Sequence, residues 1–562
     1  MSMRACVMHS WALLVLSLSF GSAPTAEVVG WRGDGSSRFP EQNPPLEWDA
    51  ATGTNIRWRT LMPNWSNSSP IVVGDKVFVT AEPTDWAPIL LCCDADSGEV
   101  LWQHELDHLD HLLGAQAATA RRTWSAVLDR YRELNRLYAG RNSLAKQQAA
   151  GEDVAAAIAE LEQRATAMGC RFIERTKKKG KDRPWTVEDG NREHQAAVKR
   201  CAEDYGLVVL LWNLGIENYR GCLTWMGYGY PTPVSDGERV YVWTAYNAVF
   251  SFSLDGQLQW INHLGKLEQQ VGCAFASNPV LADGVLICAQ AEGSKKNNEQ
   301  FITGIDAASG EIRWQQPLEY FSIHSPHSPQ ILSLDGTAYV YHSNGVLYRV
   351  SDGKPMVTGL GKSSKGNGSA VINGETVFFN VGGDGNLAKG VRFHAEGDAI
   401  RAETLFEQKG LCIAPRGHTP VIWQDQLYTR RATVDLTNGN TSRQVRATSS
   451  RQALNKRGKM DDEKAGSGIP WTLVADHHLI IGGAGGHYMN ERGGFWVIDL
   501  TNRQQVAENQ LLNAPVAERG VAFYRGESAT DEWQTFGNSA PFVAHDRIYF
   551  RSMDYLYCIG RR

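Results

Sequence analysis

One short pattern recurs along most of this 562-residue chain and constrains its fold more than any other feature. A typical copy has a small or polar residue before a proline, an apolar strand, a turn at Gly or Asp, and a second apolar strand. Strong copies begin at Ser69, Thr232, Asn278 and Ser328, and weaker copies begin at Ser369, Thr419, Ile469 and Ala540. This spacing is near that of propeller blades and predicts an all-β, eight-bladed β-propeller.

A second motif ends several copies with a tryptophan. Asp94 to Gly98 precedes Trp102, Asp306 to Gly310 precedes Trp314 at the same spacing, and Asp255 to Trp260 is a shortened form. In such a turn, Asp caps the backbone and Gly adopts a positive φ. A large flat ring fits the wedge between neighbouring blades. The expected blade-docking residues are Trp58, Trp102, Trp260 and Trp314.

The two ends of the repeat region predict how the ring closes. The chain stops at Leu556 to Gly560, where other copies continue into the Asp turn. The missing piece stands near the N-terminus, as Asp49 to Trp58. We therefore expect an N-terminal strand to complete the last blade, which removes the exposed edges of an open sheet.

These turns and the eight-fold repeat resemble the pyrroloquinoline quinone (PQQ)-like β-propeller repeat family, over roughly residues 31–104 and 223–562. That family includes quinoprotein alcohol dehydrogenases and BamB, the propeller lipoprotein of the outer-membrane β-barrel assembly machine. The Asn64 to Pro70 opening and the placement of an insert in the first blade also resemble BamB-like exported propellers of planctomycete-type bacteria. The resemblance implies the scaffold and leaves the activity open, because the repeat itself carries no chemistry.

The N-terminus and the overall charge suggest an exported protein. Arg4, the apolar stretch from Trp11 to Phe20 and the small residues up to Ala26 are typical of a secretory signal peptide. The later sequence has no apolar stretch long enough for a membrane helix, so we expect a soluble periplasmic or secreted protein. A net charge of −5 argues against a nucleic-acid partner. Nine sparse cysteines in the mature chain form neither a disulfide framework nor a metal-ligand spacing.

An insert interrupts the first blade. Trp124, Val127, Leu128, Tyr131, Leu134 and Leu137 recur at helical spacing, as do Val154, Ile158, Leu161, Met168 and Phe172. Thr186, followed by Glu188 and Asp189, is typical of the cap of a third, shorter helix. The insert is either an elaboration on the propeller rim or a partner-binding arm. The basic run from Lys177 to Arg183 is expected in a helix-connecting loop. The expected divisions are 1–26 signal peptide, 27–104 propeller, 105–222 helical insert and 223–562 propeller.

Polar residues before the proline step predict a candidate binding site at one mouth of the central channel. Radial repetition makes such positions converge, and convergent polar groups are the usual starting hypothesis for a binding site. The favoured interpretation is that they line a solvent-filled channel. Two of them are histidines, but no four-ligand metal set is visible. The candidate residues are Asn67, Ser68, Tyr230, Ser277, His327, Asn367, His418, Ser467 and Asn538.

The sequence favours a non-catalytic binding or scaffold protein of the cell envelope, monomeric, with a protein or envelope-polymer partner and no cofactor. The alternative is a PQQ-dependent oxidoreductase acting on alcohols or sugars. The resemblance implies that such an enzyme needs PQQ, a Ca²⁺ site, an Asp base and a vicinal disulfide. Cys92 and Cys93 are adjacent but precede the Asp94 turn, and no Asp-base or Ca²⁺-ligand motif matches. A third possibility, a polysaccharide-binding or polysaccharide-degrading protein, is supported only by channel aromatics such as Trp65, Tyr228 and Tyr230.

Overall fold

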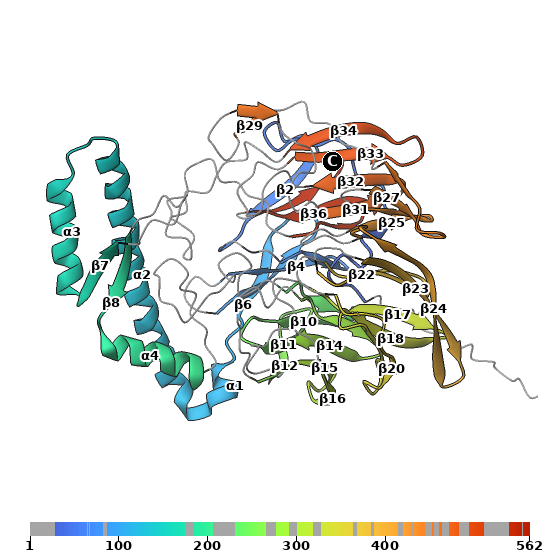
Figure 1. Ribbon diagram of the computed structural model, residues 1–562, viewed down its shortest axis with the longest axis horizontal. Helices are drawn as coiled ribbons and strands as arrows, with labels where there is room; N and C mark the ends of the chain where they lie inside the picture. The colour runs from blue at the N-terminus through green and yellow to red at the C-terminus, as the bar shows by residue number, and fades with distance from the viewer. Residues whose placement is uncertain are drawn as a thin grey trace, which may run out of the picture.

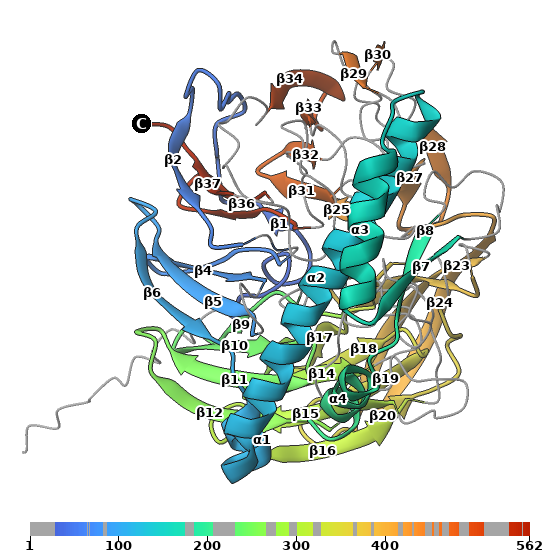
Figure 2. The same ribbon diagram turned by 90° about the vertical axis from the view of Figure 1, so that its left-hand side faces the viewer.

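The computed structural model shows an eight-bladed β-propeller with a helical insert on one face (Figures 1 and 2). The first strands of neighbouring blades contact one another, for example β13 with β17 and β3 with β35, so these strands line the central axis. The structure describes residues 28–64, 66, 68–82, 87–174, 185–205, 231–265, 277–290, 300–318, 327–363, 368–383, 387–413, 420–429, 432–443, 452–454, 460–462, 471–482, 494–510, 539–552 and 555–562.

Each blade is an antiparallel sheet of four consecutive strands, with exceptions in the last two blades. Blades 1 to 4 consist of β3 (Ile71–Val73), β4 (Lys76–Ala81), β5 (Ile89–Asp94), β6 (Val100–Glu105); β9 (Val234–Ser235), β10 (Arg239–Trp243), β11 (Ala248–Ser253), β12 (Leu258–His263); β13 (Val280–Ala282), β14 (Val285–Gln290), β15 (Phe301–Asp306), β16 (Ile312–Pro317); and β17 (Gln330–Leu334), β18 (Thr337–His342), β19 (Val346–Arg349), β20 (Pro355–Val357). Blades 5 to 8 consist of β21 (Val371–Asn373), β22 (Thr376–Val381), β23 (Leu387–Glu396), β24 (Ala399–Lys409); β25 (Val421–Trp423), β26 (Gln426–Tyr428), β27 (Ala432–Asp435), β28 (Thr441–Arg443); β31 (Trp471–Ala475), β32 (His478–Gly482), β33 (Gly494–Asp499), β34 (Gln504–Gln510); and β35 (Phe542–Ala544), β36 (Arg547–Arg551), β37 (Tyr555–Ile559) with β2 (Ile56–Leu61). A separate two-stranded sheet pairs β29 (Gln452–Leu454) with β30 (Met460–Asp462).

The ring closes as the sequence predicts, with an N-terminal strand in the last blade. β2 pairs antiparallel with β37, bringing Trp58 opposite Cys558 and Leu61 opposite Tyr555. Ile56, on the same strand, is buried in a core that it shares with blades 7 and 8. The two ends of the chain therefore hold each other in one sheet, and this fold prediction is confirmed.

The segment from Val29 to Phe39 crosses the axis of the propeller, which the sequence analysis did not foresee. Val29 exchanges backbone hydrogen bonds with Ser235 in blade 2, while Arg38 donates to Asn373 in blade 5. Arg32 donates to the carbonyl of Pro420, which precedes blade 6, at 2.5 Å. The strand β1 (Arg38–Phe39) then adds to β31 of blade 7 in parallel, near the centre of the ring in Figure 2.

This axial segment, residues 29–39, carries a charge into the interior. Arg32 is 2% exposed, and its guanidinium also donates to the side chain of Ser37 and the carbonyl of Ser36. Burial lowers its pKa to about 9, against the opposing attraction of Asp34. The acceptors of these three bonds are uncharged, so the segment is fixed by hydrogen bonds and not by an ion pair.

The described residues of the insert form four α-helices, one 3₁₀ turn and a small sheet. They are α1 (Leu109–Leu113), the 3₁₀ turn η1 (Gly114–Gln116), α2 (Ala117–Ala149), α3 (Ala155–Ala167), β7 (Cys170–Glu174), β8 (Trp185–Asp189) and α4 (Arg192–Glu203). The predicted helical stripe of α2 is confirmed, since the residues from Trp124 to Leu137 named above are all buried. In Figure 2, α2 runs in front of the ring of blades.

Two local predictions for the insert are wrong. Thr186 lies in β8 and does not cap a helix; Phe172 lies opposite Val187 in the β7–β8 pair and does not continue α3. The alternating residues of 185–189, with the β-branched Val187 buried, suit a strand better than a helix start. The predicted short third helix corresponds to α4, which begins after Asn191. The Asn191 side chain accepts the His194 backbone N–H. The basic run Lys177 to Arg183 lies outside the described residues, between two strands.

Candidate binding face

A belt of hydrogen bonds joins neighbouring blades at the start of their first strands. Its members stand at the position directly before the repeat's proline, which is Ala370 in the fifth blade. The backbone N–H of one member donates to the side-chain oxygen of the member in the next blade. The bonds are Ala540 to Ser69 (2.9 Å), Ser69 to Thr232 (3.2 Å), Thr232 to Asn278 (2.7 Å), Asn278 to Ser328 (2.9 Å) and Ser328 to Ser369 (2.9 Å). They connect blade 8 through blades 1, 2, 3 and 4 to blade 5.

The belt explains why a proline recurs at the start of the first strand of most blades. Proline fixes φ and has no N–H, so the chain enters the first strand in a set direction while the preceding residue makes the lateral bond. Members of the belt are buried, and a buried N–H without an acceptor would cost stability. The two remaining equivalent positions, Thr419 and Ile469, lie outside the described residues.

Three of the predicted channel-mouth residues lie in the described part of the chain, one position before the belt. Ser68, Ser277 and His327 are all 2% exposed or less. The structure brings Ser277 and His327 together, because the Ser277 hydroxyl donates to the His327 carbonyl at 3.3 Å. The Ser68 hydroxyl donates to the carbonyl of Ser69. Asn67, Tyr230, Asn367, His418, Ser467 and Asn538 lie outside the described residues.

Removing one belt hydroxyl should destabilise the ring. Ser328→Ala takes the acceptor from both the backbone N–H and the side-chain amide of Asn278. We expect the free energy of unfolding to fall by about 1–3 kcal/mol, measured by chemical denaturation. Ser309→Ala, in an exposed turn of the neighbouring blade, is the control and should change stability by less than about 0.5 kcal/mol. Equal losses for both variants would contradict a structural role for the belt.

The four predicted docking tryptophans each contact the turn of the following blade. Their indole N–H groups donate to backbone carbonyls: Trp58 to Ala95 (3.0 Å), Trp102 to Leu254 (3.1 Å), Trp260 to Ala307 (3.0 Å) and Trp314 to Val350 (2.8 Å). Each ring also lies against a glycine of that turn. A Cβ at Gly98 would stand 2.5 Å from the Trp58 ring, and one at Gly353 would stand 2.5 Å from the Trp314 ring.

A buried ion cluster braces the insert internally. Both carboxylate oxygens of Asp189 accept from Arg130, at 2.6 and 3.0 Å, and one also contacts His194 Nδ1 at 2.6 Å. Burial alone would raise the pKa of Asp189, but the bonds from His194 and Arg130 lower it below its usual value. These bonds tie α2, β8 and α4 together, so the insert is a small packed unit and not a loose loop.

Two histidines lie where the insert joins the propeller, His108 fully buried and His263 half-buried. His108, just before α1, contacts the rings of Tyr246 and His263 at centroid distances of 5.4 and 5.3 Å. Burial, together with a smaller effect of the neighbouring His263, lowers the pKa of His108 to about 3. Burial likewise lowers the pKa of His263 to about 4. Both rings are therefore neutral at physiological pH, and His108 contacts Tyr246, a member of a core that insert and propeller share.

Acid should weaken this junction. Both folded-state pKa values lie below the ordinary histidine value of about 6.5. The neutral rings therefore contribute fully to the free energy of unfolding above that pH. This contribution is lost as the pH falls towards about 4 for His263 and about 3 for His108. For His108 we expect a loss of about 1.4 kcal/mol per pH unit below 6.5, measured by denaturation across pH. His108→Gln should flatten this slope, whereas His111→Gln, at an exposed position, should not. A slope that His108→Gln leaves unchanged would argue against the junction as its source.

The adjacent cysteines Cys92 and Cys93 do not form a disulfide in the structure. Cys92 and Cys93 lie on β5, the third strand of blade 1, and both are buried free thiols. Burial raises the pKa of each to about 12, which is typical of inert packed cysteines. Among the described residues, one group of three or more potential metal ligands is present, Asp476, His477 and His478. It belongs to a strand turn of blade 7 and not to the channel mouth.

Three features of this region were not predicted from the sequence. The belt position was visible as a small residue before proline, but its lateral bonding depends on neighbours up to 471 residues away. The axial segment carries a local signal in its glycines from Gly30 to Gly35, yet its partners belong to different blades. The Asp476 group was visible only as a short Asp-His-His run.

Solved structures resemble this chain only at low sequence identity. No curated protein matches the sequence. Solved structures with a similar fold include BamB from Moraxella catarrhalis, at 13% identity and TM-score 0.35, covering 58% of this chain and 80% of that one. A quinohemoprotein alcohol dehydrogenase from Pseudomonas putida HK5 matches at 11% identity and TM-score 0.32, covering 83% of this chain and 64% of that one. Apo AztD from Citrobacter koseri matches at 13% identity and TM-score 0.31, covering 50% and 71%.

A family model places the sequence more firmly than these structural likenesses. The model described as outer membrane protein assembly factor BamB matches residues 42–172 and 223–379, which together are just over half of the chain. The gap between the two matched ranges, residues 173–222, falls within the expected insert, residues 105–222. The chain belongs to this BamB family of PQQ-like propellers.

Proposed function

We propose that this protein is a non-catalytic binding scaffold of the cell envelope, and that its insert-bearing face holds a protein partner. The observation that carries the proposal is the position of the insert, which adds a braced helical layer across the channel-mouth face (Figure 2). The insert packs through one continuous core onto blades 2 and 3. A rigid helical surface on a propeller face suits recognition of another macromolecule.

The interior of the propeller supports binding at a face over chemistry in the channel. The axial segment bonds to residues of blades 2, 5 and 7 across the centre, and the belt side chains are engaged in bonds between blades. The exposed surface of α3 mixes acidic Glu160 and Glu162 with Arg164. Such mixed charge favours a folded protein partner over a uniformly charged polymer. Among the described residues, no helix is long and apolar enough to cross a bilayer.

Site-specific photo-crosslinking in intact cells tests this proposal. A photoreactive amino acid replaces exposed Glu160 on α3, and the matched control places it at exposed Asp398, in the β23–β24 turn that points away from the insert in Figure 1. We expect a discrete covalent adduct with an envelope protein from position 160 and none from position 398. Adducts of equal yield from both positions, or none from position 160, would contradict binding at the insert face.

A further inference from the structure

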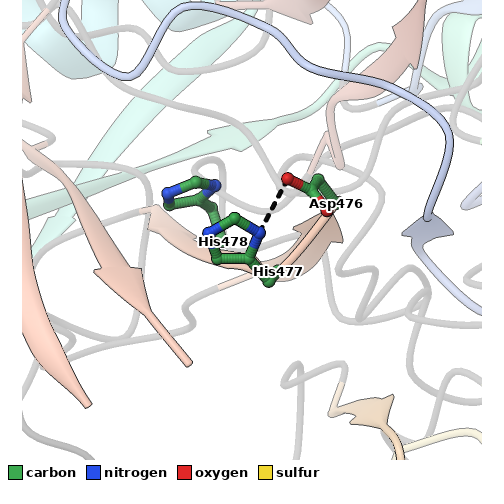
Figure 3. A group of neighbouring side chains, drawn as sticks. All are labelled: Asp476, His477 and His478. Atoms are coloured by element: carbon green, nitrogen blue, oxygen red, sulfur yellow. Dashed lines mark ion pairs between the residues drawn. The ribbon is translucent and has the colours of Figure 1, made fainter. Parts of the chain in front are cut away.

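The turn between β31 and β32 brings three potential metal ligands together. Asp476, His477 and His478 each offer one ligand atom, and these atoms lie within 4.8 Å of one another (Figure 3). His477 Nδ1 stands 2.7 Å from an Asp476 carboxylate oxygen. The two imidazole rings lie 4.1 Å apart between centroids, at an interplanar angle of 37°. The side chains of Asp476 and His477 are 47% and 35% exposed, so a solvated ion has access to them.

The backbone of this turn is held from two sides. The Asp476 N–H donates to the carbonyl of Phe39, at the end of the axial segment, at 3.1 Å. The His477 carbonyl accepts from the Leu500 N–H, at 3.0 Å, and His478 pairs with Asp499 across β32 and β33. Asp476 itself has a φ of 51°, which asparagine and aspartate tolerate better than most residues. The three side chains therefore start from a fixed backbone and not from a mobile loop.

We propose that Asp476, His477 and His478 form a binding site for a divalent cation of the zinc class. Two imidazole nitrogens and one carboxylate oxygen are ligands that Zn²⁺ takes at about 2.0–2.2 Å, with a fourth position left for water. Tetrahedral ligands at that distance stand roughly 3.4 Å apart, so side-chain rotations suffice to bring the present atoms into range. The nitrogen and oxygen set disfavours Ca²⁺ and Mg²⁺, which prefer oxygen ligands alone.

The site is separate from the proposed partner-binding face. The β31–β32 turn bonds to the β33–β34 turn, which points away from the insert in Figure 1. A cation bound here would cross-link residues next to the anchor of the axial segment on blade 7. We therefore expect it to stabilise that anchor without affecting crosslinking from position 160.

Isothermal titration calorimetry tests the site. Zn²⁺ is titrated into the purified full-length protein near neutral pH. We expect about one equivalent of Zn²⁺ to bind with micromolar or tighter affinity. The double variant His477→Gln/His478→Gln should weaken this binding at least tenfold. The control His394→Gln removes a histidine that pairs with Glu403 on the β23–β24 hairpin and should bind Zn²⁺ as tightly as the original protein.

Two further measurements keep the outcome decisive. Co²⁺ in place of Zn²⁺ should give a spectrum of nitrogen and oxygen ligands, and a thiolate charge-transfer band would overturn the proposal by placing the metal on cysteine. Asp476→Asn, at the exposed side of the turn, should also weaken Zn²⁺ binding and serves if the double variant fails to fold. Absence of stoichiometric binding, or equal affinity in the variants and the original protein, would equally overturn it.

Discussion

Replacing Trp314 with alanine is expected to lower the free energy of unfolding by about 3–5 kcal/mol, the range for removing a large buried aromatic side chain. The Trp314 ring is 7% exposed and lies against Gly353 of the next blade, while its N–H donates to the Val350 carbonyl. Alanine removes both contacts and opens the wedge between blades 3 and 4. Chemical denaturation monitored by circular dichroism measures the loss.

Trp314→Phe is the matched variant, because the propeller already uses phenylalanine in this way. A Cβ at Gly439 would stand 2.7 Å from the Phe406 ring, so Phe406 takes the equivalent place between blades 5 and 6. Phenylalanine keeps most of the buried ring and loses the hydrogen bond, which contributes about 0.5–1.5 kcal/mol. We therefore expect the free energy of unfolding of Trp314→Phe to lie much closer to that of the original protein than to that of Trp314→Ala. Losses as large as those of the alanine variant would show that ring packing is not the main contribution.

Introducing a charge into the closing strand should have an effect of similar or greater size. Ile56→Asp places a carboxylate in the core shared by blades 7 and 8, where Ile56 is 8% exposed and pairs with Ile559. A buried unpaired charge and the lost apolar contact together should cost about 4 kcal/mol or more. Release of β2 would expose β37 as an unpaired edge, so we also expect self-association in size-exclusion chromatography.

The same strand supplies the control. Leu61→Asp introduces the same charge at a position that is 50% exposed and pairs with Tyr555 at the other end of β2. This variant should stay monomeric and lose less than about 0.5 kcal/mol. If both variants remain closed and equally stable, the N-terminal strand does not hold the ring together.

Features of the fold that depend on residues close together in the sequence could be predicted, and features that depend on distant residues could not. The blade turns, the closing strand and the long helix α2 follow from short-range patterns, and the structure confirms them. The strand β8 was mistaken for a helix cap because Thr186 and its acidic neighbours fit a capping pattern equally well. The course of the axial segment was not predictable, since Val29 and Arg32 find their partners on blades far apart in sequence. The channel-mouth set was predicted by position, and its three described members proved to be buried.

The proposal that this propeller binds a partner and does not oxidise a substrate is tested most directly by reconstitution. Purified full-length protein is incubated with PQQ and Ca²⁺, and reduction of an artificial electron-accepting dye is measured with a panel of alcohols and sugars. The structure, with its axial segment across the centre and Cys92 and Cys93 buried as free thiols on β5, predicts no substrate-dependent reduction above the protein-free control. Dye reduction that requires the protein, PQQ and a substrate together would contradict the binding-scaffold assignment.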